Sequence, residues 1–239
     1  MALRLYYEEP GIQLWCGANQ EMLAELDPAS IDLLLTDPPY GVNTPVDNRR
    51  FSGKGRLTGA RTFGARTCVS ARRPVYGDCE PFDPTPLLRF PRLVLFGANH
   101  FASRLPDSGG WIVWDKRKGL EDMQNWPFSE AELAWTNLSG TVRMYRNRWM
   151  GLVRDSELGE HYHPTQKPVA LMRWILERWT KQGDLILDPY CGSGPVLRAA
   201  KDLGRRAIGV EIYLEYCDVV IKRLQQGVLA LDSLDAAEA

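Results

Sequence analysis

The sequence predicts an α/β protein built on a doubly wound, mostly parallel sheet. Short apolar runs alternate along the chain with longer stretches of helical spacing, and this alternation is typical of βαβ units. The 44% hydrophobic and 25% charged residues are ordinary values for a globular protein. With 239 residues the chain can enclose a sizeable core, so we expect a single domain over residues 1–239.

The predicted strands are the short apolar runs, and the predicted helices lie mostly between them. We expect strands over 12–16, 31–36, 92–96, 111–114, 184–187 and 206–210, and helices over 19–25, 99–105, 169–181, 196–203 and 214–226. The segments 132–135 and 141–149 have the pattern of an antiparallel pair of strands. In a sheet of this kind, ligands bind at the carboxyl ends of the strands, so the turns that follow the predicted strands are the candidate ligand-binding segments.

The turn after the predicted strand 31–36 contains Asp37, Pro38, Pro39 and Tyr40. Two prolines fix φ and stiffen the turn, and the Tyr40 ring can stack on a flat ligand. The Asp37 carboxylate and the Pro38 carbonyl can accept both N–H bonds of a ring amine, which stabilises the positive charge that develops when this amine attacks an electrophile. A strand-ending turn without function is the alternative interpretation of these four residues alone.

A second turn follows the predicted strand 184–187 and leads into the predicted helix 196–203. It is rich in glycine, which lets a ligand approach the backbone closely, and it contains Asp188, Pro189, Tyr190, Gly192, Ser193 and Gly194. About twenty residues beyond these glycines Glu211 ends the next predicted strand, where an acid typically holds the ribose hydroxyls of an adenosine-containing ligand. The third glycine of a dinucleotide-binding fingerprint is missing.

With these motifs in this order, the chain resembles the class β DNA amino-methyltransferases, and most of all the short adenine methyltransferases of phages and prophages. Residues 36–41, 95–99, 110–116, 163–168 and 188–195 carry the resemblance, which extends over most of the chain. It implies the Rossmann-like fold of class I S-adenosylmethionine-dependent methyltransferases, S-adenosyl-L-methionine as cofactor and double-stranded DNA as substrate. The implied reaction is methyl transfer to the N6 amine of a flipped adenine, and a homodimer is a possible assembly.

The resemblance also implies roles for individual residues. Asp37, Pro38, Pro39 and Tyr40 would be catalytic. The cofactor would be bound by Gly17, Asn19, Thr165, Gln166, Lys167, Asp188, Pro189, Tyr190, Gly192, Ser193, Gly194 and Glu211. In the family, the stretch around Lys167 borders the amino-acid end of the cofactor, where a cation suits a carboxylate. This stretch could instead simply lead into the helix that follows.

Two positions depart from the family pattern. Ala18 stands where most members have an acid that binds the adenine amine of the cofactor, and Pro195 stands where most have Thr. The family's cytosine-N4 enzymes more often carry Ser in place of Asp37, so the sequence favours adenine.

The net charge of −1 hides a basic segment directly after the catalytic turn. Between residues 41 and 77, Asp47 is accompanied by Arg49, Arg50, Lys54, Arg56, Arg61, Arg66, Arg72 and Arg73. This position predicts a loop that binds DNA phosphates with salt-dependent, largely sequence-independent affinity. A solvated loop without a ligand is the alternative.

A small target-recognition insert is expected around 116–162. Within it, basic and aromatic residues are mixed at Arg143, Tyr145, Arg146, Arg148 and Trp149. They form either a surface that faces DNA or, for the aromatic side chains, part of the core.

Other classes of protein fit the sequence less well. Five cysteines without a Cys-x-x-Cys pair and three histidines predict neither a disulfide framework nor a metal site. No apolar run is long enough to span a bilayer and no signal-peptide pattern is present, so we expect a cytoplasmic protein. Methylation of cytosine N4, a catalytically silent DNA-binding homologue and methylation of RNA remain open as alternatives.

Overall fold

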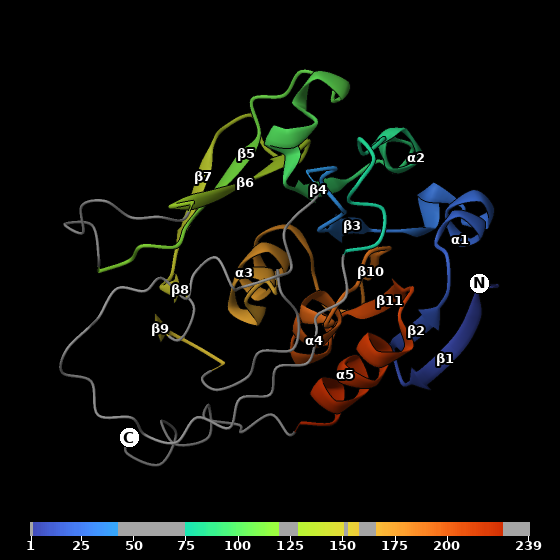
Figure 1. Cartoon of the computed structure of the whole chain (residues 1–239). Coiled ribbons are helices and arrows are strands. Elements are labelled where there is room, and N and C mark those ends of the chain that lie inside the picture. Colours follow the sequence, from blue (N-terminus) through green and yellow to red (C-terminus); the bar gives the residue numbers. More distant parts are fainter. Residues whose placement is uncertain (1, 43–74, 120–128, 151–152, 158–165, 227–239) are drawn as a thin grey trace, which may run out of the picture.

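The structure, a computed structural model, describes residues 2–42, 75–119, 129–150, 153–157 and 166–226 of the chain. Within these residues, nine strands form one sheet in the order β1-β2-β11-β10-β3-β4-β6-β5-β7 (Figure 1). The bounds of these strands are β1 Arg4–Glu9, β2 Ile12–Cys16, β3 Leu33–Thr36, β4 Leu93–Phe96, β5 Trp111–Asp115, β6 Ala131–Thr136, β7 Arg143–Arg146, β10 Leu185–Asp188 and β11 Arg206–Glu211. Two further strands, β8 Trp149–Met150 and β9 Val153–Arg154, pair with each other.

Most neighbouring strands of the sheet run parallel. β2, β11, β10, β3 and β4 form a continuous parallel block, while β1 is antiparallel to β2 and β6 is antiparallel to both of its neighbours. The doubly wound, mostly parallel α/β sheet that the sequence predicts is therefore confirmed.

Two apolar layers cover the sheet because the side chains of its central strands alternate between the faces. Leu33 and Leu35 of β3 belong to one buried cluster and Leu34 belongs to the other. The first cluster includes buried residues of α3 Val169–Trp179, α4 Pro195–Asp202 and α5 Leu214–Gln225. The second includes residues of α1 Gln20–Glu25 and α2 Thr85–Leu88. All residues of β3 and β4 are buried, which explains the apolar runs that form them, followed in β3 by the hydrogen-bonded Thr36.

The predicted antiparallel pairing of 132–135 with 141–149 is wrong. β6 instead lies between β4 and β5, and β7 pairs in parallel with β5 at the edge of the sheet. Burial explains this order: Ala134 and Trp135 need neighbours on both sides, whereas the exposed Arg143 and Met144 suit an edge strand. β6 and β7 thus belong to the central sheet, and the target-recognition role of the segment 116–162, part of which lies outside the described residues, stays a prediction.

The predicted helix over 99–105 is also wrong. Two short 3-10 helices, Ala98–His100 and Ala102–Arg104, take its place, and a third spans Pro28–Ser30. Leu105 is extended, as expected for a residue that precedes proline, so a regular helix cannot continue through it. The sequence reading also missed β1, whose exposed and half-buried residues lack the alternation that marks a strand. Among the described residues, we find no helix with the length and apolar character needed to cross a bilayer.

Candidate active site

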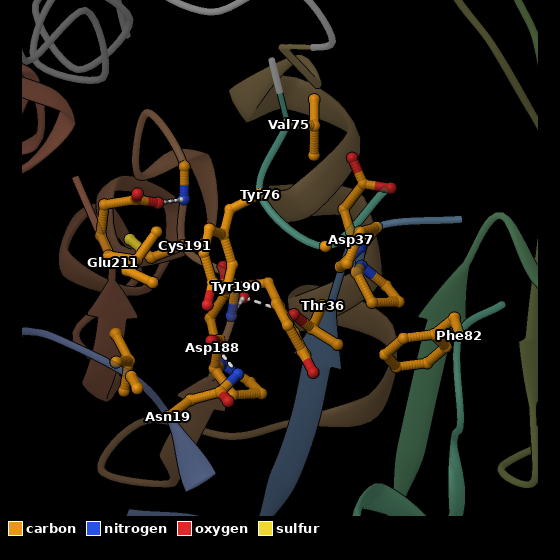
Figure 2. A pocket seen from close by; sticks show the side chains of 18 of the residues that line it. Asn19, Thr36, Asp37, Val75, Tyr76, Phe82, Asp188, Tyr190, Cys191 and Glu211 are labelled. Carbon is orange, nitrogen blue, oxygen red and sulfur yellow. Dashed lines mark hydrogen bonds between the residues drawn. The ribbon is translucent and has the colours of Figure 1, made fainter. Parts of the chain in front are cut away.

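The carboxyl ends of β2, β3, β10 and β11 open onto one cavity of about 690 Å³ (Figure 2). These four strands are parallel, so the turns that follow them meet at the same edge of the sheet. The cavity is lined both by the turn of Asp37 to Tyr40 and by the turn that contains Gly192 and Ser193. The two motifs that the sequence singled out are therefore side by side.

Almost all the described residues of the predicted site line this cavity. The lining includes Asp37, Pro38, Pro39, Tyr40, Gly17, Asn19, Gln166, Lys167, Asp188, Pro189, Tyr190, Gly192, Ser193 and Glu211. Gly194 does not; it begins α4 with φ +75°, and a Cβ there would lie 2.8 Å from Val220 Cγ1. Thr165 and the basic residues Arg49, Arg50, Lys54, Arg56, Arg61, Arg66, Arg72 and Arg73 lie outside the described residues.

Glu211 holds the glycine turn against the end of β11. Its Oε2 accepts a hydrogen bond from the backbone N–H of Gly192 at 2.9 Å, and its Oε1 accepts one from the N–H of Tyr213 at 2.8 Å. Burial raises the pKa of Glu211 to about 7, and the backbone hydrogen bonds oppose this rise. The carboxylate faces the cavity and can accept further hydrogen bonds from ligand hydroxyls.

Asp188 connects the two turns. Its Oδ1 accepts a hydrogen bond from the hydroxyl of Thr36 at 2.6 Å and another from the backbone N–H of Tyr190 at 3.2 Å. Burial raises the pKa of Asp188 to about 7 despite these two donors. Since Thr36 directly precedes Asp37, this contact joins the end of β10 to the start of the predicted catalytic turn.

Asn19 supports the glycine turn from the other side. Its Nδ2 donates to the carbonyl of Pro189 at 2.9 Å, and the residue is buried. Beyond Pro189, the ring of Tyr190 packs edge-on against Phe82, with 5.8 Å between ring centroids (Figure 2). Because Ala18 has no polar side chain, the polar groups that this segment places in the cavity wall are those of Asn19 and Gln20.

The predicted catalytic turn is held in a defined orientation. The Tyr40 hydroxyl donates to Asp37 Oδ1 at 2.5 Å, and the Tyr40 ring stacks on His100 with 5.0 Å between centroids and 14° between planes. Gly97 lies directly under this ring: its φ is +66°, and a Cβ there would be 1.9 Å from Tyr40 Cε1. Glycine is thus required at this position both by the backbone and by the close approach of Tyr40.

Asp78 anchors the end of the predicted catalytic turn and the residues that follow it. Its Oδ1 accepts hydrogen bonds from the backbone N–H groups of Tyr40 at 3.0 Å, Gly41 at 2.9 Å and Val42 at 3.3 Å. The side chain is only 4% exposed. Sequence reasoning missed this role, since an isolated Asp beside a basic segment gives no signal that it binds backbone far away in sequence.

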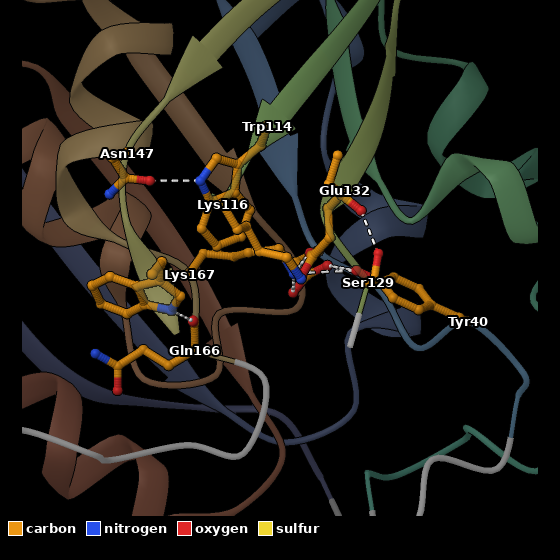
Figure 3. Close-up of polar contacts among 11 residues, drawn as sticks. Tyr40, Trp114, Lys116, Ser129, Glu132, Asn147, Gln166 and Lys167 are labelled. Atoms are coloured by element: carbon orange, nitrogen blue, oxygen red, sulfur yellow. Dashed lines mark hydrogen bonds and ion pairs between the residues drawn. The ribbon is translucent and has the colours of Figure 1, made fainter. Parts of the chain in front are cut away.

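Lys167 lies against the predicted catalytic residues. Its Nζ is 2.5 Å from Asp37 Oδ2, 3.1 Å from Glu132 Oε2 and 3.2 Å from the Tyr40 hydroxyl (Figure 3). The resemblance implies a place beside the amino-acid end of a cofactor, but in this structure the ammonium pairs with Asp37 and Glu132. Glu132 on β6, which the sequence reading missed, also binds Lys116 at 2.9 Å.

The charges in this cluster shift one another. Burial opposes ionisation of Glu132, but Lys167 and Lys116 outweigh it and lower the pKa of Glu132 to about 2. Burial likewise disfavours the cationic form of Lys167, yet Asp37 and Glu132 raise its pKa well above the usual range. For Asp37, burial prevails and raises the pKa, although Lys167 works against it. The cluster therefore places an ammonium whose charged form is stabilised beside a carboxylate whose pKa is raised.

A second buried network joins the segment of Lys167 to the glycine turn. Glu157 accepts hydrogen bonds from Gln166 Nε2 and from the backbone N–H of Val169, both at 2.7 Å, and pairs with Arg223 at 2.7 Å. Arg223 also donates to the carbonyl and the hydroxyl of Ser193, each at 2.9 Å. Glu157 has φ +55°, an unusual value for a residue other than glycine, and its contacts hold it there.

The mixed basic and aromatic segment divides its side chains between surface and core. Arg143 and Arg146 are exposed. Tyr145 packs on Trp174 with 5.4 Å between centroids, and the buried Trp149 donates to the carbonyl of Gln166 at 3.1 Å. The aromatic residues therefore support the core and the segment of Lys167. Within this set, Arg143, Arg146 and the partly exposed Arg148, which pairs with Asp155, remain candidates for contacts with DNA.

Comparison with known proteins defines the class. A family model described as DNA methylase matches residues 112–222. The type II methyltransferase M2.LlaDCHI of Lactococcus lactis subsp. cremoris is 41% identical over 257 aligned residues, which cover 93% of this chain and 92% of the relative. The type II methyltransferase M.HpaI of Haemophilus parainfluenzae is 27% identical, over 93% of this chain and 77% of the relative. The chain therefore belongs to the N6/N4 DNA methylase family and is a DNA methyltransferase.

Solved structures support the fold. The M1.HpyAVI–SAM complex is 22% identical with a TM-score of 0.52, covering 90% of this chain and 99% of that chain. The PvuII DNA methyltransferase, which is cytosine-N4-specific, is 14% identical with a TM-score of 0.56, covering 91% of this chain and 88% of that chain. At this identity they establish a shared fold, that of the class I S-adenosylmethionine-dependent DNA methyltransferases.

Proposed function

We propose that this chain transfers a methyl group from S-adenosylmethionine to the N6 amine of adenine in double-stranded DNA, after the adenine has been turned out of the duplex. The observation that carries the proposal is the single cavity that the Asp37–Tyr40 turn and the Gly192–Ser193 turn line together. Direct transfer requires that donor and acceptor share one cavity, because no covalent intermediate carries the methyl group between separate sites.

The cofactor side of the cavity fits an adenosine with a charged tail. Glu211 faces the cavity with acceptor oxygens suited to ribose hydroxyls, and the backbone of Gly192 permits close approach. Tyr190 and Phe82 provide apolar wall for a purine ring. When bound there, S-adenosylmethionine supplies a methyl group made electrophilic by its sulfonium.

On the base side, Asp37 and the Pro38 carbonyl accept the two N–H bonds of the amine. As N6 attacks, the new N–C bond forms while the S–C bond breaks, and positive charge develops on the nitrogen. Asp37 stabilises this charge and then takes up the proton, a role that its raised pKa favours. Tyr40 stacks on the extruded base and offsets part of the cost of flipping, which is on the order of a few kcal/mol.

Asp at position 37 favours adenine over cytosine, since Ser is more frequent at this position in the family's cytosine-N4 enzymes. The basic residues between 49 and 73 are proposed to neutralise phosphates next to the catalytic turn, so affinity should fall steeply with salt.

The test measures transfer of a labelled methyl group to duplex DNA, followed by mass spectrometry of the nucleosides. We expect N6-methyladenine from the natural protein and, for Asp37→Ala, a loss of at least about 10²-fold in rate with cofactor affinity nearly unchanged. Asp107→Ala serves as the matched control because Asp107 is exposed and does not line the cavity. Detection of N4-methylcytosine in place of N6-methyladenine would show that cytosine is the target base. Full activity of Asp37→Ala would contradict the proposed role of the turn.

A further inference from the structure

Four charged, mostly part-buried side chains form a cluster at the base side of the cavity, and two of them, Asp37 and Lys167, line the cavity itself. Asp37 follows β3. Glu132 lies on β6, Lys116 follows β5, and Lys167 precedes α3 (Figure 3). The ion pairs run in a chain from Lys116 to Glu132, from Glu132 to Lys167 and from Lys167 to Asp37, at 2.9, 3.1 and 2.5 Å. Two cations and two anions balance, so the cluster adds no net charge to the site.

Lys167 is better placed to bind a ligand than an ordinary structural lysine. Its side chain is only 3% exposed, yet the residue lines the cavity. Of its three contacts, the one to Tyr40 is the longest, at 3.2 Å, and that hydroxyl already donates to Asp37. One of the three ammonium protons can therefore turn to a new acceptor while the ion pairs to Glu132 and Asp37 remain.

Asp37 and Lys167 together present a hydrogen-bond acceptor directly beside a donor. The complementary edge of a nucleobase has an amine next to a ring nitrogen that carries a lone pair. Adenine has this edge, with its N6 amine beside N1, and so does cytosine, with its N4 amine beside N3. On its Watson–Crick edge guanine presents a protonated ring nitrogen beside its amine, and the unprotonated N3 on the other side of that amine lies next to the sugar. Thymine has no amine.

We propose that Lys167 donates a hydrogen bond to the ring nitrogen of the target base, next to the amine whose N–H donates to Asp37. Glu132 is the positioning residue that holds the Lys167 ammonium in place. The inference rests on the proposed function, because it concerns the base that is methylated, but it applies equally to adenine and to cytosine. The pair would orient the amine toward the methyl donor and exclude guanine and thymine.

Glu132 solves an electrostatic problem that this arrangement creates. A cation near the amine would destabilise the positive charge that develops on the amine during transfer. The carboxylates of Glu132 and Asp37 flank the ammonium at 3.1 and 2.5 Å and offset its field. Lys167 can then act as a directional donor without opposing the reaction.

The test replaces the ring nitrogen of the target base by carbon. Sequencing first identifies the methylated sequence, and duplexes are then made with 1-deazaadenine at the target, or with 3-deazacytosine if the target is cytosine. We expect kcat/KM of the natural protein to fall about tenfold to a hundredfold with the deaza base, as for loss of a hydrogen bond to a charged group. This measurement needs no variant, so it does not depend on how well any variant folds.

Two variants separate recognition of the ring nitrogen from other effects. In Lys167→Met the donor is gone, so the ratio of kcat/KM between natural and deaza base should fall to the value set by the intrinsic reactivity of the two amines. This intrinsic value is common to all forms of the protein, and the variant measures it. Lys116→Met is the matched control, because Lys116 binds the same Glu132 but does not line the cavity. Its ratio should equal that of the natural protein.

Two results would overturn the inference: equal activity of the natural protein on natural and deaza bases, or an unchanged ratio in Lys167→Met. If Lys167→Met instead weakened cofactor binding and kept the ratio, Lys167 would hold the cofactor, as the family resemblance implies. Absence of methyl transfer to any natural duplex is a different outcome, which rejects the proposed function itself.

Discussion

Replacing Thr36 by Val should destabilise the protein in a pH-dependent way. The Thr36 hydroxyl donates to Asp188 Oδ1 at 2.6 Å, and both residues are buried. The Asp188 pKa is about 7 in the folded protein against an ordinary value of 3.8. Between pH 3.8 and 7, Asp188 is deprotonated in the unfolded chain but still protonated in the folded protein. The stability that this bound proton contributes is therefore lost as pH rises toward and through 7.

The size of the effect follows from the protonation state of Asp188. At pH 5.5 the carboxyl is neutral, and loss of a neutral hydrogen bond costs about 0.5–1.5 kcal/mol. At pH 8.5 it is ionised, and loss of a hydrogen bond to a charged group costs about 1.5–3 kcal/mol. Thr36→Val should therefore cost about 1 kcal/mol more at pH 8.5 than at pH 5.5, because loss of the donor raises the pKa of Asp188 further.

Urea unfolding at the two pH values measures this difference, with equal denaturant slopes as the check that the unfolded states are comparable. Thr36→Ser is the control, because it loses the methyl group and keeps the hydroxyl; its cost should be the same at both pH values. An equal cost of Thr36→Val at both values, or a larger one at pH 5.5, would refute the electrostatic reasoning.

Two further predictions concern the base side and the cofactor side. Gly97→Ala should displace the Tyr40 ring, 1.9 Å from the new Cβ, and reduce methyl transfer about 10²-fold at nearly constant cofactor affinity, whereas Gly140→Ala, with no atom within 4 Å of its Cβ, should leave both unchanged. Because burial raises the pKa of Glu211 to about 7, cofactor affinity measured by calorimetry should fall as pH drops from 8 to 6, by up to about tenfold. In Glu211→Gln the dependence of cofactor affinity on pH should be weaker. An unchanged dependence would show that Glu211 does not cause it.

The positions of the parallel strands could be predicted because their sequences carry the physical cause of their burial. β3 and β4 are buried on both faces, so their apolar runs are uninterrupted, and the predicted range 12–16 equals β2. The turns were predictable for a similar reason: Pro38, Pro39 and Gly192 restrict or free the backbone through their own covalent structure. Local chemistry was sufficient in each of these cases.

The order of the last strands and the ion-pair cluster were not predictable, because both depend on contacts between distant segments. Nothing in the sequence of β6 shows that it enters the sheet between β4 and β5, and the sequence-adjacent β7 was the natural but wrong partner. Once β6 lies beside β4, Glu132 comes within reach of Lys167. The same misassignment of β6 thus hid both the strand order and the carboxylate that holds Lys167.

The chain order of the two motifs matters less than the neighbourhood of their strands. β3 and β10 are far apart in sequence but adjacent and parallel, with Leu34 paired to Leu187. Their following turns must therefore emerge at the same edge, separated by roughly the 4.8 Å spacing of neighbouring strands. The Thr36–Asp188 hydrogen bond spans this distance, because it joins the last residue of β3 to the last residue of β10. In the proposed function, a donor bound at one turn and an amine held at the next would therefore lie within reach of direct transfer, whichever motif comes first in the chain.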